Sequence, residues 1–154
     1  MRALIQRVTH ASVSAPDATT QSIEKGFCIL LGVGPTDTKE IVEALWNKIY
    51  KLRIFEDTQG KTNQSLSDVG GSALIVSQFT LYADCKKGNR PSFTKSASPS
   101  LAEELYNHFL YCASKSDVPI KAGWFGAMMK LHIVNDGPFT LWLDTEELFP
   151  HMHS

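Results

Sequence analysis

The chain has 154 residues, of which 43% are hydrophobic and 20% are charged, and its formal net charge is -1. This length suits a single domain over residues 1–154, and the hydrophobic content excludes a disordered chain. The near-neutral charge excludes a nucleic-acid binder whose whole surface is strongly basic, but it allows a local basic patch. The three cysteines have no paired spacing, and no apolar run is long enough to span a membrane, so we expect a soluble cytoplasmic protein.

The first half of the chain predicts strands on either side of a helix. Hydrophobic residues alternate over residues 2–8, which places Ala3, Ile5 and Arg7 on one face of a strand. The apolar run at residues 27–33 is typical of a strand buried on both faces. A helix should follow, with Asp37 as its N-cap and an apolar stripe at helical spacing. The stripe comprises Ile41, Val42, Leu45, Ile49 and Leu52.

The second half predicts a long strand, a helix and a terminal hairpin. Residues 73–84 alternate as one strand, and a second helix should begin at Ser98 with Pro99 in its first position. Near the C-terminus, two strand-like runs flank an Asp-Gly pair, which is the strongest short-range indication of a hairpin. Pro138 follows that pair and has no N–H to give to a strand ladder, so its presence there asks for another explanation.

Together these elements amount to roughly seven strands and two helices. Strand-only stretches at both ends of the chain argue against a doubly wound parallel sheet. The predicted fold class is α/β, with mixed, largely antiparallel β-sheets in a barrel- or sandwich-like arrangement and two main helices packed on one side.

Three polar residues stand out within apolar elements. In the predicted strand at residues 73–84, Gln78 and Thr80 share one face, and buried polar groups need partners. A plain structural role, with a loop as partner, explains both residues at least as well as a site does. Arg7 shares a face with apolar residues and needs an acceptor, either in a salt bridge within the fold or on a functional loop that it braces.

The segment CKKGNRPSF brings Lys86, Lys87 and Arg90 close together. Such a cluster is commonly a solvated turn, and the functional alternative is a contact with phosphate. No histidine has convincing metal-ligand spacing, so no metal is expected. The chain also lacks a Walker-type phosphate loop and identifiable partners for a Ser-His-Asp triad.

Several segments together resemble the D-aminoacyl-tRNA deacylase family. The most specific are SQFTL at residues 77–81 and NDGPFT at residues 135–140, which occur in the right order. The opening MRALIQRVTHASV, the LLGV strand, the KKGNRPSF loop and GWFGAMM at residues 123–129 also fit. The resemblance covers the chain from Met1 to about Asp144.

The resemblance implies a homodimeric, cytoplasmic esterase without a cofactor. Its substrate would be an aminoacylated tRNA carrying a D-amino acid or glycine on the terminal adenosine. The implied catalytic residues are Ser77, Gln78, Phe79 and Thr80. Gly137 and Pro138, joined by a cis bond, would form a chiral-selectivity motif that enters the partner's site, and Arg7 would brace the partner's loop. Lys86, Lys87 and Arg90 would contact the acceptor stem, and Phe125 would either stack on the terminal adenine or pack in the core.

For the mechanism, main-chain N–H groups near Gln78, Phe79 and Thr80 would stabilise an oxyanion. Thr80 has no evident base beside it, so attack by water assisted by the 2'-hydroxyl of the RNA is favoured over a nucleophilic threonine. Two alternatives stay open at this point. One is a thiol- or metal-dependent hydrolase that uses Cys85 or the C-terminal histidines, and the other is a non-catalytic RNA-binding or interaction domain.

Overall fold

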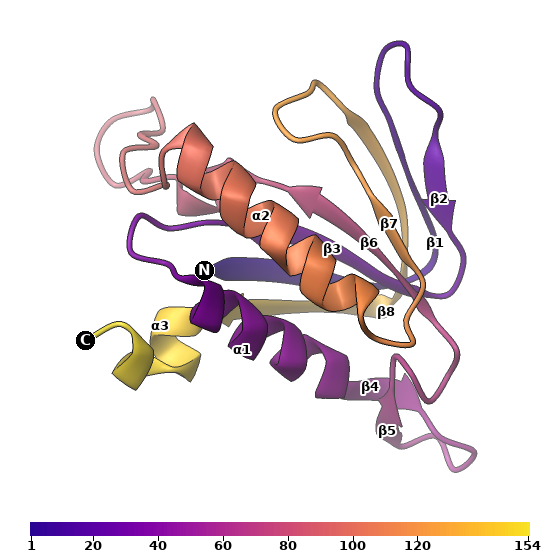
Figure 1. The fold of residues 1–154 in the computed structure, drawn as a ribbon. Helices are drawn as coiled ribbons and strands as arrows, with labels where there is room; N and C mark the ends of the chain where they lie inside the picture. The colour runs from indigo at the N-terminus through magenta and orange to yellow at the C-terminus, as the bar shows by residue number, and fades with distance from the viewer.

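The computed structural model describes residues 1–154 and contains a six-stranded sheet, a two-stranded sheet and three α-helices (Figure 1). The strands are β1 (Arg2–Ser14), β2 (Gln21–Ile23), β3 (Gly26–Gly32), β4 (Arg53–Glu56), β5 (Thr62–Ser65), β6 (Ser72–Ser77), β7 (Ile120–Ala122) and β8 (Lys130–Asp144). The helices are α1 (Lys39–Lys51), α2 (Pro99–Ser114) and α3 (Thr145–Leu148), with short 3-10 turns η1 (Phe79–Tyr82) and η2 (Pro150–Met152). None of these helices combines the length and the hydropathy that crossing a membrane requires.

Strand β1 is the centre of the large sheet. It pairs with β3 and β2 in the order β2-β1-β3-β6-β7, and β8 pairs with β1 as well. The pairings of β1 with β2, β3 and β8 are antiparallel, whereas β3–β6 and β6–β7 are parallel. The expected mixed, largely antiparallel α/β architecture is therefore confirmed. The strands differ from the expected set because β5 and β7 are additional and the two strands expected at the C-terminus form one, and α3 is an additional short helix.

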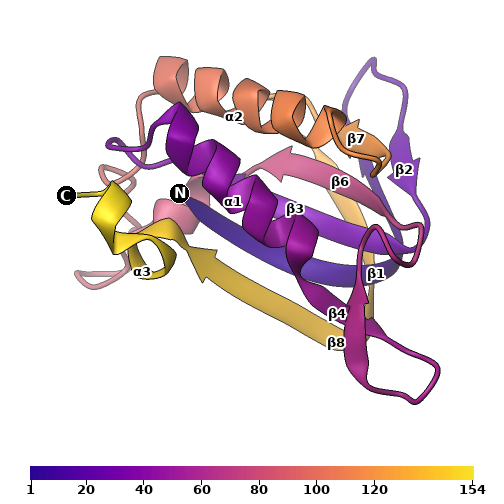
Figure 2. The same ribbon diagram turned by 60° about the horizontal axis from the view of Figure 1, so that its bottom comes forward.

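Helices α1 and α2 lie side by side over one face of the sheet (Figure 2), as the sequence predicts. Their buried residues join inward residues of β1, β3 and β6 in a core of 25 residues, which includes Ile5, Ile29, Leu45 and Phe109. A smaller apolar cluster of 7 residues, including Val8, Cys28 and Val76, lies on the other face. β3 is thus covered on both sides, in agreement with its continuous apolar sequence.

The predicted strand over residues 73–84 is wrong in its second half. β6 ends at Ser77, and the chain then turns into the 3-10 turn η1. The alternation of Gln78, Thr80 and Tyr82 imitates a strand, but the segment packs against the end of β3 instead of continuing the ladder. Non-local contact thus overrides a local pattern at this point.

The predicted C-terminal hairpin is also wrong. Residues 130–144 form the single strand β8, and both halves of it pair with β1. The register shifts between the pairs Gln6–Thr140 and Val8–Asn135, so the extra residues 136–139 form a large bulge that leaves the ladder. Pro138 is tolerated there because the bulge needs no ladder hydrogen bond from it.

The start of α1 differs by one residue from the prediction. Thr38 is the N-cap, and its Oγ1 accepts a hydrogen bond from the Ile41 N–H. Asp37, the predicted cap, is buried and accepts from the Gly34 N–H and from the N-terminal ammonium of Met1, at 2.6 Å each. The start of α2 at Ser98 and Pro99 is confirmed.

The cysteines give a direct test of this fold. Cys28 is fully buried in β3, and burial raises the pKa of its thiol to about 12, so almost no thiolate forms at pH 8. Cys85 is exposed. A disulfide reagent at pH 8 should therefore modify Cys85 in the native protein and reach Cys28 only in denaturant, as mass spectrometry of the labelled peptides would show. Equal labelling of the two thiols in native protein would contradict the position of β3.

Candidate functional site

Two main-chain donors lie unpaired at the start of η1. The Gln78 N–H donates to the carbonyl of Leu31 at 2.8 Å and so anchors the turn to β3. Phe79 and Thr80 are the first two residues of the 3-10 turn, so their N–H groups have no acceptor within it; no turn, loop or side-chain hydrogen bond uses them, and both residues are exposed. Of the three expected oxyanion donors, the Gln78 N–H is therefore occupied, whereas those of Phe79 and Thr80 are free to bind one anionic oxygen.

The side chains of the same segment bond one another. The Gln78 amide donates to Thr80 Oγ1 at 2.5 Å, which explains why the sequence places both on one side. A carboxamide cannot remove a proton from a hydroxyl, so this contact does not activate Thr80 as a nucleophile. Ser77 is half-buried at the end of β6, directly before the turn.

Two glycines, one at the end of β3 and one just after it, let the turn approach the sheet. A Cβ at Gly32 would lie 3.1 Å from Leu81 Cβ and 3.2 Å from the Gln78 carbonyl oxygen. A Cβ at Gly34 would lie 2.8 Å from the hydroxyl oxygen of Tyr82. Larger residues would push η1 outward, so the LLGVG sequence is what allows β6 to end and turn here.

Arg2 supports η1 from the opposite side. Its guanidinium donates to the Leu81 carbonyl at 3.0 Å and to Asp144 Oδ2 at 2.9 Å, and it lies 4.4 Å from the centre of the Tyr82 ring. The role of Arg2 was missed in the sequence, as was that of the glycines. The only indication of it was a second arginine near the start of a buried strand.

An open cavity of about 620 Å³ lies beside the free N–H groups. Ser77, Gln78 and Phe79 line it together with residues of α2 and of the segment that precedes β8. Phe125 lines the cavity and also packs on the core, with its ring 5.9 Å from that of Tyr106. No aspartate, glutamate, histidine or cysteine is among the lining residues. The cavity therefore offers apolar surface and main-chain donors, but no side-chain base.

The bulge at residues 136–139 is held by a buried arginine. Arg7 Nε donates to the Asp136 carbonyl at 2.9 Å, and a terminal nitrogen donates to the Ile54 carbonyl at 2.8 Å. The guanidinium also lies 4.8 Å from the centre of the Phe139 ring. These contacts are made within one chain, whereas the expectation placed Arg7 on the partner's loop.

Two further features fix the bulge. The Asn135 side chain spans it, accepting from the Phe139 N–H at 2.7 Å and donating to Thr140 Oγ1 at 2.8 Å. Gly137 has a φ of 140°, which L residues rarely adopt, and the Gly137–Pro138 peptide bond is cis. Gly137 and Pro138 themselves are exposed at the tip.

The turn and the bulge do not meet in a single chain. Arg7 pairs with Phe27 on β3, whereas the turn is anchored at Leu31, about 13 Å further along the strand at the usual rise per residue. No residue of the bulge lines the cavity. The structure thus brings Ser77, Gln78, Phe79, Thr80 and Phe125 together but leaves Gly137 and Pro138 apart from them.

The predicted basic loop is free to bind an anion. Lys86, Lys87 and Arg90 are all exposed, and none of them forms a salt bridge. Asp84 at the base of the loop pairs with Lys95 at 2.9 Å and accepts from the Lys86 N–H, and these bonds lower the pKa of its carboxyl. The loop begins just after η1, so its charges lie near the turn.

One group of side chains has the composition of a metal site. The ligand atoms of Glu43, His108 and Cys112 lie within 4.8 Å of one another, with His108 and Cys112 one turn apart on α2. Sequence inspection overlooked that spacing. The group shares no residue with the cavity, and neither Cys85 nor the C-terminal His151 and His153 lines it. A thiol or metal mechanism in this cavity therefore has no residue to carry it.

A family model described as D-Tyr-tRNA(Tyr) deacylase matches residues 4–144. The chain belongs to the D-Tyr-tRNA(Tyr) deacylase family. It is similar to the D-aminoacyl-tRNA deacylase of Thermosipho africanus, with 50% identity over 149 residues that cover 97% of this chain and 100% of the relative. It is likewise 53% identical to the D-aminoacyl-tRNA deacylase of Chloroflexus aurantiacus over 148 residues, which cover 96% of this chain and 92% of the relative.

Two solved structures share the deacylase fold seen here. One, described as "c-Myc DNA Unwinding Element Binding Protein", has a TM-score of 0.87 and 44% sequence identity, covering 94% of this chain and 98% of that one. The other, described as "Structural Analysis of a probable eukaryotic D-amino acid tRNA deacylase", has a TM-score of 0.83 at 17% identity, covering 93% of this chain and 98% of that one. At that identity the second match supports the fold alone.

The contacts of Arg7 predict a measurable loss of stability. Its replacement by alanine leaves the Asp136 and Ile54 carbonyls without their donor, which should lower the free energy of unfolding by about 2–3 kcal/mol. Arg53→Ala is the matched control, because that arginine is exposed on β4 and should change stability by less than about 0.5 kcal/mol. Equal midpoints of urea unfolding for the two variants would show that Arg7 does not hold the bulge.

Proposed function

We propose that this chain hydrolyses the ester that joins a D-amino acid or glycine to the terminal adenosine of tRNA, releasing the amino acid and free tRNA. Its family membership makes it a D-aminoacyl-tRNA deacylase, and the proposal concerns its substrates, mechanism and assembly. The observation that carries it is the pair of free N–H groups beside an apolar cavity that contains no side-chain base. We place the enzyme in the cytoplasm, as a homodimer that needs no cofactor.

The cavity suits a terminal adenosine. Its volume of about 620 Å³ falls in the range of small-molecule sites, and the rings of Phe79 and Phe125 offer apolar surface to a base. Stacking on aromatic side chains tolerates any base, so recognition of the adenine needs no dedicated polar pocket. With the base in the cavity, the ester on the ribose can reach the free donors of η1.

Hydrolysis then requires stabilisation of one negative charge. Water adds to the ester carbonyl carbon, and the carbonyl oxygen becomes an oxyanion that accepts from the Phe79 and Thr80 N–H groups. Loss of one such donor costs about 3 kcal/mol in other enzymes. The 2'-hydroxyl of the ribose assists the attacking water, and the bond from the carbonyl carbon to the 3'-oxygen breaks. The 3'-oxygen takes up a proton, and the amino acid leaves as a free acid.

Selectivity for the D form comes from a main-chain wall supplied by a second copy of the chain. The tip of the bulge is exposed, fixed by Arg7 and Asn135, and absent from its own cavity, which leaves it available to a partner's cavity. Carbonyl oxygens there would occupy the space of an L side chain, whereas a D side chain would project away and glycine has none. A clash of this kind rejects one enantiomer strongly, which a missing contact does not.

The basic loop supports binding of the rest of the RNA. Lys86, Lys87 and Arg90 contact phosphates of the acceptor stem, since they are unpaired and lie close after η1. Such contacts set position and affinity but carry no information about sequence.

The substrate proposal has a direct assay. Purified protein should deacylate D-Tyr-tRNA and Gly-tRNA and spare L-Tyr-tRNA, because only an L side chain meets the main-chain wall. The three rates are compared by following release of labelled amino acid, with the spontaneous rate as the baseline. Equal hydrolysis of D-Tyr-tRNA and L-Tyr-tRNA would exclude a chiral role for the site.

Two variants separate main-chain from side-chain catalysis. Thr80→Val removes the hydroxyl but keeps the N–H, so kcat for D-Tyr-tRNA should stay within about tenfold of wild type. Gly32→Ala keeps the hydroxyl but puts a methyl group 3.1 Å from Leu81 Cβ, which displaces the donors and should lower kcat further than Thr80→Val does. The reverse order of the two kcat values would assign the chemistry to the hydroxyl.

A further inference from the structure

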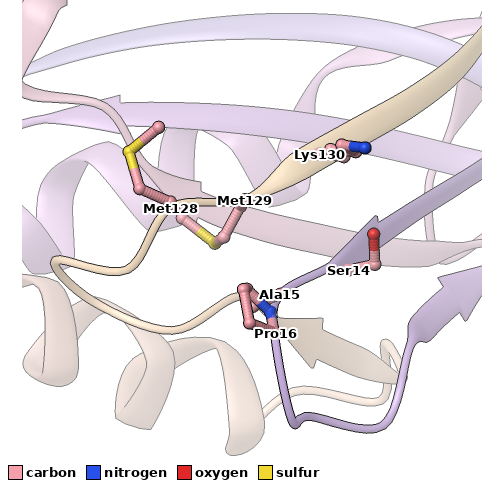
Figure 3. A pocket seen from close by; sticks show the side chains of 6 residues that line it. All are labelled: Ser14, Ala15, Pro16, Met128, Met129 and Lys130. Carbon is pink, nitrogen blue, oxygen red and sulfur yellow. The ribbon is translucent and has the colours of Figure 1, made fainter.

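A second, smaller hollow of about 320 Å³ lies beside the cavity (Figure 3). It is lined by Ser14, Ala15, Pro16, Met128, Met129 and Lys130. Met128 and Met129 line both spaces, so the two lie on either side of this segment. In Figure 3, the Met129 side chain points toward Ala15 and Pro16, and the Met128 side chain points to the other side of its segment.

The hollow is built where β1 and β8 end together. Ser14 is the last residue of β1 and pairs with Lys130, the first residue of β8. The segment that enters β8 carries the two methionines, and the turn that leaves β1 carries Pro16. Because the strand pair holds both walls, the hollow keeps a fixed position relative to the cavity.

The lining combines apolar surface with one cation. The Met128 side chain is 85% exposed, the highest value among the exposed large hydrophobic residues, and it lies at the boundary of the two spaces. A polarisable thioether and a proline ring offer the kind of surface that the face of a nucleobase covers. Lys130 is exposed and forms no salt bridge, so its ammonium is free for a phosphate. The Ser14 hydroxyl can donate to or accept from a ribose or a base edge.

We infer that this hollow binds the nucleotide that precedes the terminal adenosine of the RNA. Its base lies against Met129 and Pro16, and the phosphate that links it to the adenosine faces Lys130. The inference rests on the proposed function, which puts the adenosine in the adjoining cavity. The proximity of the two spaces and the single unpaired cation select a nucleotide over an apolar ligand. The RNA then leaves the cavity over Met128 and Lys130, and the basic loop contacts the stem further on.

Substrates of increasing length test this assignment. D-tyrosine is esterified to adenosine alone and to the dinucleotide cytidylyl-adenosine, and kcat/KM is measured for each. In wild type, the added nucleotide should raise kcat/KM by about tenfold or more, as one stacked base typically does. In the double variant Pro16→Ser, Lys130→Ala, whose two residues line only the smaller hollow, this gain should fall to near unity, while kcat/KM for the adenosine ester stays the same. Lys61→Ala, which removes an exposed charge near β5, is the control and should keep the full gain.

Other results would overturn the inference. An undiminished gain in the double variant, no gain in wild type, or an equal loss on both esters would each show that the hollow does not hold the nucleotide. Failure of wild type to hydrolyse the adenosine ester at all would instead refute the proposed function. Binding of unesterified cytidylyl-adenosine and of adenosine, measured by calorimetry, then tests the hollow separately. There the double variant should lose the tighter binding of the dinucleotide, and equal affinities for the dinucleotide in wild type and variant would refute the subsite.

Discussion

The hydrogen bonds of the Arg7 guanidinium are the interaction on which the position of the bulge depends. Arg7 is a buried cation, 8% exposed, and it binds carbonyls of two segments that are remote from it in sequence, at Ile54 and Asp136. A buried charge is tolerated only when its donors are satisfied, so the position of each carbonyl is fixed by the cost of leaving Arg7 unpaired. One side chain on the central strand thereby sets the path of the bulge at residues 136–139.

The proposed site consists mostly of main-chain atoms. The turn η1 presents two N–H groups, and the bulge presents an exposed glycine and proline. Contacts within the fold fix the position of both segments. Arg2 and the close approach to Gly32 fix the turn, and Arg7 and Asn135 fix the bulge. Main-chain groups cannot adapt by changing rotamer, which suits the proposed rejection of one enantiomer.

The sequence predicted correctly those elements that are determined by interactions between residues close together in the chain. Ser98 and Pro99 start α2 because a cap and a pre-set φ act within one turn, and the buried faces of β1 and β3 follow from their hydrophobic pattern. The end of β6 at Ser77 was missed because it depends on the close approach of η1 to Gly32 and Gly34, which are remote in sequence. The hairpin was wrong because Asp-Gly describes only the turn, whereas pairing of both halves of β8 with β1 decides the topology.

The central claim is that a bulge from one chain completes the cavity of another. Its most direct test mixes two folded variants under conditions that exchange subunits, one lacking Gly137 and Pro138 and one with Thr80→Trp blocking the pocket. Each homodimer should be inactive or unselective. A mixed dimer has one intact pocket that faces one intact bulge, so selective hydrolysis of D-Tyr-tRNA should return to about a quarter of the wild-type level when equal amounts exchange fully. No recovery despite demonstrated exchange of subunits would contradict the claim, since every site would then carry a defect of its own chain.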